Sequence, residues 1–254
     1  RPGYHRRPWL ALLAGPPLLW VGLGGGLMWG FAAAALGLVA ARASAGRQAV
    51  GLVAVAGLAG AFAALGQIGD VVFAHLHNAV AVGLWWAWRP RTSRLHWLPL
   101  AMMLAAAGFL VSDAALVAAS RSGGLEWFGG GMGADYQVWR LSPGVSPEWG
   151  LRLVLLFCFA QTIHYAVWLQ LLPDEDRERA APPTLRTRWA GLVADMGRPL
   201  LYGAIAASVG LAAWAVRDLM DACHGYFRMA RFHGHLELCA AALMLVEGRR
   251  VTTA

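Results

Sequence analysis

Long apolar runs, separated by short segments that carry arginine, are the feature that most constrains how this sequence can fold. Hydrophobic residues make up 58% of the chain and charged residues only 14%, whereas a soluble domain of this length needs about a quarter charged residues to cover its surface. We therefore expect an all-α integral membrane protein rather than a soluble enzyme, a disordered chain or a disulfide scaffold. The runs cover approximately residues 8–43, 49–67, 70–88, 97–119, 150–172, 198–216 and 225–246.

The first run, 8–43, decides the number of spans. It is too long for one helix across a hydrocarbon core of about 30 Å, and Gly24, Gly25 and Gly26 interrupt it near its middle. It is either a hairpin of two short helices or an interfacial segment followed by one long helix. The hairpin gives eight spans, and it is favoured because it keeps most arginines on one side of the membrane.

The arginine distribution then predicts the topology. With eight spans, the Arg-rich segments 42–47 and 177–188 lie on the same side as both chain termini, which is the cytoplasmic side under the positive-inside rule. We predict one helical domain, 1–254, that forms a polytopic bundle of about eight (seven to eight) transmembrane helices. A Trp- and Gly-rich loop at 121–149 would cover the outer face, and a charged loop at 173–197 would lie in the cytoplasm.

The type of basic residue excludes several functions. The net charge is +7, and all 21 basic residues are arginine. Without lysine the chain can form neither a retinal Schiff base nor a pyridoxal imine, and it can contain no P-loop. Because the arginines flank apolar runs and do not form one stripe, they indicate membrane topology, and no nucleic-acid partner is expected.

Ionisable and amide side chains inside the apolar runs indicate a functional site. An Asp or Arg at the centre of a membrane helix costs about 2.5–3.5 kcal/mol on insertion scales, so each one needs an explanation. Such residues occur in four of the runs. They are Asp70, His75, His77 and Asn78; then Asp113; then Gln161 and His164; and finally His224, Arg228, Arg231, His233, His235 and Glu237.

Helical geometry groups these residues. Asp70 and His77 share one face of their helix, whereas His75 and His77 point about 200° apart. If Asp70 and His224 mark the outer ends of their helices, His77, Asp113 and the last two histidines lie about 9–17 Å below the outer surface, with His164 slightly deeper. Four helices would then place nitrogen and oxygen atoms in one layer, as a metal or haem site within a bundle requires.

The candidate roles follow from the side-chain chemistry. Imidazole suits iron, zinc and copper, and nearby carboxylates favour non-haem iron or zinc. Arg228 and Arg231 are candidates to bind a lipid phosphate or a substrate anion, although ion pairs with Glu237 or Asp218 would explain them equally well. The predicted metal ligands are His77, His164, His233, His235 and Asp70, and the predicted catalytic acids or bases are Asp113 and Glu237.

Two short stretches resemble known membrane families. Phe157-Cys-Phe-Ala-Gln-Thr-Ile-His-Tyr resembles the His-bearing helix of the Brp/Blh-type carotenoid dioxygenases, a resemblance that implies a His-bound iron centre. Gly69-Asp70 and Gly108-Phe-Leu-Val-Ser-Asp113 look like the Gly-Asp and Ser-Asp motifs of the lysoplasmalogenase-type eight-helix proteins. Each match is local, and neither assigns the chain to a family.

Four functions compete at this stage. The first is a non-haem iron-dependent oxidoreductase that acts on a lipid-soluble substrate and works with an electron-donor protein or within a larger membrane complex. The second is a b-type cytochrome, in which His77 with His164 or His235 would ligate haem b. The third is a zinc-dependent intramembrane hydrolase, and the fourth is a transporter or assembly factor without enzymatic activity.

Overall fold

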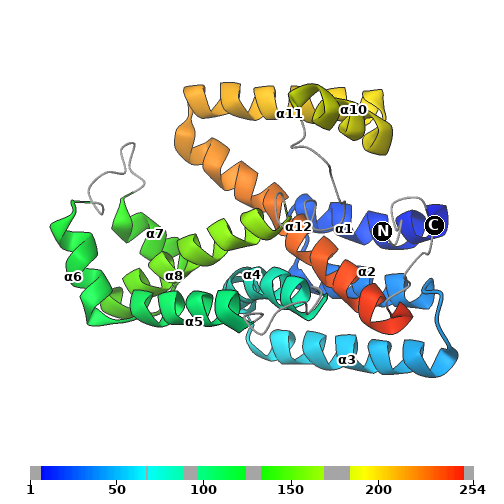
Figure 1. Cartoon of the computed structure of the whole chain (residues 1–254), viewed down its shortest axis with the longest axis horizontal. Helices are drawn as coiled ribbons and strands as arrows, with labels where there is room; N and C mark the ends of the chain where they lie inside the picture. The colour runs from blue at the N-terminus through cyan, green and yellow to red at the C-terminus, as the bar shows by residue number, and fades with distance from the viewer. Residues whose placement is uncertain (1–6, 67, 89–96, 124–132, 169–183, 249–254) are drawn as a thin grey trace.

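The regular elements are helices throughout the part of the chain that the computed structural model describes, residues 7–66, 68–88, 97–123, 133–168 and 184–248 (Figure 1). The side chains of residues 87, 88 and 195 lie outside this description. The helices are α1 (Pro8–Gly22), α2 (Leu27–Val39), α3 (Ala45–Ala64), α4 (Ile68–Trp88), α5 (Leu98–Leu110), α6 (Asp113–Arg121), α7 (Ala134–Leu141), α8 (Pro147–Ala166), α10 (Leu185–Met196), α11 (Arg198–Arg217) and α12 (Leu219–Glu247).

The first apolar run consists of two helices, as the hairpin alternative predicts. α1 and α2 pack against each other, and the chain reverses between them over residues 23–26. Gly24 adopts a φ of 108°, a conformation that an L residue with a side chain rarely adopts. The glycines that interrupt the apolar run therefore form the turn.

The long apolar helices support a membrane protein, but the described part of the chain contains fewer than eight of them. Three described helices are long and apolar enough to cross a bilayer by length and composition, namely α3, the described part of α4 and α11. α5 and α6 could form a fourth span, but they are bent by 72° where run 97–119 was expected to be continuous. The bend occurs because Ser112 is extended and starts a new helix, with the acidic Asp113 in its first turn.

Both predicted loops contain a helix. In 121–149, residues 124–132 lie outside the described residues, while α7 packs on α8 and is therefore not a free linker. In 173–197, residues up to 183 lie outside the description, and the remainder contains α10. That helix begins at Thr184, whose hydroxyl accepts a hydrogen bond from the Thr187 amide, and ends at Gly197, whose φ is 78°.

α12 is the element that positions the site. It runs across the middle of the molecule in Figure 1 and packs against α1, α2, α3, α4 and α11. At its last residue, Glu247 accepts a 2.6 Å hydrogen bond from the Arg7 guanidinium and a 2.7 Å bond from the Arg42 amide. These bonds hold the start of α1 and the end of α2 against the end of α12.

Candidate metal centre

Three imidazoles from three helices meet at one point. His77 of α4, His164 of α8 and His233 of α12 each offer one ring nitrogen, and these atoms all lie within 4.8 Å of one another. The ring centroids of His77 lie 5.2 Å from those of both other histidines, which are 5.7 Å apart. The three rings therefore surround a common point.

Two imidazoles of this triad are buried and the third, His233, is half-buried, and all three rings keep nitrogens without hydrogen-bond partners among the described residues. His164 is 1% exposed and His77 is 8% exposed. Within the described ranges, no partner is present for either ring nitrogen of His77, for Nδ1 of His164 or for Nε2 of His233. Because a buried polar atom without a partner costs about 1–3 kcal/mol, the arrangement indicates that something else binds these nitrogens.

A carboxylate from α12 completes the cluster. Oε1 of Glu237 lies 3.0 Å from Nε2 of His164, and its Oε2 is buried without a partner in the described part of the chain. His233 and Glu237 lie one helical turn apart, so α12 presents an imidazole and a carboxylate on the same face. The carboxylate can orient the His164 ring or bind a cation directly.

The donor set fits a metal ion. Neutral imidazole is a ligand for iron, zinc and copper, and a carboxylate is suited to iron and zinc. Two nitrogens bound to one tetrahedral ion lie about 3.4 Å apart when each metal–nitrogen bond is about 2.0–2.1 Å. The three rings would therefore move together by about 1 Å on binding, a shift within the range of small side-chain rotations.

The structure separates His75 from His77, as their helical phase predicts. Nε2 of His75 lies 2.8 Å from the carbonyl oxygen of Leu141, to which it can donate, and the ring packs edge-on against Phe157. His77 instead faces the other two histidines of the triad. α4 therefore directs one histidine to the α7 end and the other to the common point.

His235 lies outside the triad. Its ring stacks on Phe73 with centroids 4.2 Å apart, and its Nδ1 is 3.0 Å from the carbonyl oxygen of Arg231. His233 and His235 point about 200° apart on a regular helix, so only one of them can face the common point. The sequence could not distinguish them, because Glu237 shares a helix face with His233 and His224 shares a face with His235.

The predicted aspartates also lie elsewhere. Asp70 pairs with Arg231 at 3.3 Å, and Asp113 pairs with Arg152 near the start of α8. Arg152 and His164 are about 18 Å apart along the axis of that helix at 1.5 Å per residue. Glu237 is therefore the predicted acid that the structure brings to the triad.

Two further residues lie beside His77, and the sequence analysis assigns neither of them a role. Phe73 lies one turn before His77 and stacks on it with an interplanar angle of 14°. Asn78 is fully buried beside His77 and donates to the carbonyl oxygen of Ala74. The i, i+4 spacing of Phe73 and His77 was a usable signal, because it places both rings on one face.

Comparisons with known proteins add no identity to this geometry. No family model matches the chain, no curated protein matches it, and no solved structure matches it.

Proposed function

We propose that this chain is a membrane-embedded metalloprotein in which His77, His164 and His233 bind one metal ion. The observation that carries the proposal is the convergence of two buried imidazoles and one half-buried imidazole, each with a ring nitrogen that lacks a partner among the described residues. Three protein ligands leave coordination positions open for a substrate, as in catalytic metal sites.

We further propose that the ion is non-haem iron and that the protein is an oxidoreductase with a lipid-soluble substrate. Iron would supply one-electron and oxygen chemistry, and the Glu237 carboxylate beside the triad suits a hard cation such as iron. In this account His77, His164 and His233 hold the ion, while Glu237 orients the His164 ring. A substrate would enter from the bilayer, and electrons would come from a donor protein or a larger membrane complex.

The geometry favours a bare ion over haem b. A porphyrin needs a flat slot between two histidines, whereas here a third ring lies 5.2–5.7 Å from the other two. A zinc-dependent hydrolase is the second candidate, because the unpartnered Oε2 of Glu237 could act as general base.

For the topology, we propose a polytopic bundle of about eight spans with both termini in the cytoplasm. The α1–α2 hairpin and the contact between Arg7 and Glu247 support an even number of crossings, because they hold the two ends of the described chain together. A reporter fused after Arg250 should lie on the same side of the membrane as one inserted between Arg186 and Arg188. Opposite sides would refute the topology.

Metal analysis combined with an optical spectrum of the purified protein tests the function. The proposal expects about one iron per chain and no Soret band. A Soret band would establish haem b instead, and zinc in place of iron would establish the second candidate. Absence of any bound metal after purification and reconstitution with ferrous iron would refute the metal centre.

A further inference from the structure

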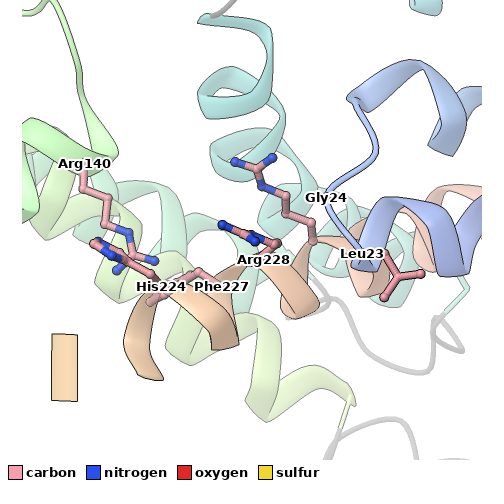
Figure 2. A pocket seen from close by; sticks show the side chains of 7 residues that line it. Leu23, Gly24, Arg140, His224, Phe227 and Arg228 are labelled. Atoms are coloured by element: carbon pink, nitrogen blue, oxygen red, sulfur yellow. The ribbon is translucent and has the colours of Figure 1, made fainter. Parts of the chain in front are cut away.

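A basic pocket lies between α7 and the first half of α12. Its volume is about 510 Å³, within the range for small-molecule sites. Figure 2 shows Arg140 and His224 at one end of the pocket and Arg228 farther along, toward Gly24. Leu23, Gly24, Arg140, His224, Phe227, Arg228 and Arg231 line it.

The lining brings three guanidinium groups together, and no carboxylate is among the described residues that form it. Arg140 is held in place, because its guanidinium lies 3.3 Å from the Phe227 ring centroid and donates to Sγ of Cys223 at 3.2 Å. Arg231 has Asp70 at 3.3 Å, whereas Arg228 makes no ion pair with any described residue. The pocket therefore carries positive charge that the described residues only partly neutralise.

We propose that this pocket binds the phosphate group of an anionic ligand. The planar guanidinium fork matches phosphate oxygens in a bidentate geometry, and several arginines around one concavity are the usual protein arrangement for this anion. Clustered like charges close to a membrane interior are costly, and a bound anion removes that cost. His224 adds a polar group at the rim, where its Nε2 lies 2.7 Å from the Tyr136 hydroxyl.

The position of the pocket indicates a class of substrate, a step that rests on the proposed function. Arg228 precedes His233 on the same helix by about 7.5 Å along the axis at 1.5 Å per residue. A ligand held by its phosphate in the pocket could extend an apolar chain toward the triad. We therefore infer that the substrate is a phosphate-headed amphiphile.

Calorimetric titration of the full chain in detergent tests the pocket. The protein is first stripped of metal, so that the result does not depend on the metal centre. The probes are inorganic phosphate and dihexanoyl phosphatidic acid, with dihexanoyl glycerol as the uncharged control. We expect phosphatidic acid to bind and the glycerol lipid not to bind. If inorganic phosphate also binds, the phosphate group alone is recognised. If phosphatidic acid binds and inorganic phosphate does not, the acyl chains contribute to binding.

Matched variants distinguish specific binding in the pocket from nonspecific attraction of anions to a basic protein. R228Q should weaken phosphatidic acid binding about tenfold or more, because a charge-assisted hydrogen bond is lost. R140Q provides a second variant from α7 with the same expected direction. R217Q removes the same charge from an exposed residue outside the pocket lining and should change affinity less than about twofold.

Two results would overturn the pocket. One is that neither phosphate probe binds, and the other is that R217Q weakens binding as much as R228Q and R140Q do. Failure of the metal centre is distinguishable from failure of the pocket. In that case the protein would take up no iron but would still bind the phosphate probes normally.

Discussion

Nε2 of His164 on α8 lies 3.0 Å from Oε1 of Glu237 on α12, and Nδ1 of the same ring has no hydrogen-bond partner among the described residues. A carboxylate that holds one imidazole nitrogen fixes the orientation of the ring and raises the basicity of the other nitrogen. The pair therefore determines how His164 faces the other two histidines.

Removal of this carboxylate should weaken the metal centre without abolishing it. We expect E237A to lower metal affinity about 10–100-fold, the usual effect of losing a group that orients a ligand, and E237Q to lower it less because the amide oxygen can still accept. Competition with a chelator measures the affinity, and E148Q, a change of an exposed acid on α8, is the control. Unchanged affinity in E237A would contradict the orienting role, and complete loss of metal would make Glu237 a ligand.

His235 should matter for stability and not for metal binding. Its ring packs against Phe73 and edge-on to Phe31, away from the common point of the triad. We expect H235A to keep the wild-type metal ratio and to lose about 1–3 kcal/mol of unfolding free energy. Thermal unfolding and metal analysis of the same preparation test both parts, and loss of metal from a folded H235A protein would contradict the assignment.

Asp113 and Glu148 should act on Arg152 as alternatives. Both acids are largely exposed, while the Arg152 side chain is only 8% exposed. D113A and E148A should each cost under about 1 kcal/mol, because the other acid still pairs with the guanidinium. The double variant should cost more than the sum, because it leaves a buried cation without an acid. Thermal unfolding of the wild type, the two single variants and the double variant completes a double-mutant cycle. Additive losses of unfolding free energy would refute the shared role of the two acids.

Gly30 should be needed where α2 meets α12. A Cβ atom at this position would collide with the buried ring of His235, whereas one at Gly37 on the same helix would have its nearest contact 3.6 Å away, at Leu10. We expect G30A to destabilise the fold by about 1–3 kcal/mol and G37A to be neutral or slightly stabilising. Comparable unfolding temperatures for the two variants would show that the helices are not packed this closely.

The sequence predicts the helical class and most members of the site, because both depend on local patterns. Apolar runs mark the helices, the glycines of the first run mark the turn, and the helical phase of α4 places His75 and His77 on different faces. The bend before Asp113 and helix α10 were missed, because both depend on capping within segments that look uniformly apolar or charged.

The choice between His233 and His235 lay beyond local pattern. It depends on the rotation of α12 about its own axis, which packing against α2 and α4 determines. The ion pairs of Asp70 with Arg231 and of Asp113 with Arg152 each join two different helices, α4 with α12 and α6 with α8, and spacing within single helices contains no information on such pairs.

The metal-to-protein ratio of four histidine variants tests the central claim most directly. We expect H77A, H164A and H233A each to lose the bound ion, because each removes one of three ligands. H75A should retain it, because that ring contacts the Leu141 carbonyl and not the triad. All four proteins must first elute as folded species in detergent. Full retention of metal in the three triad variants would contradict the account, as would its loss in H75A alone.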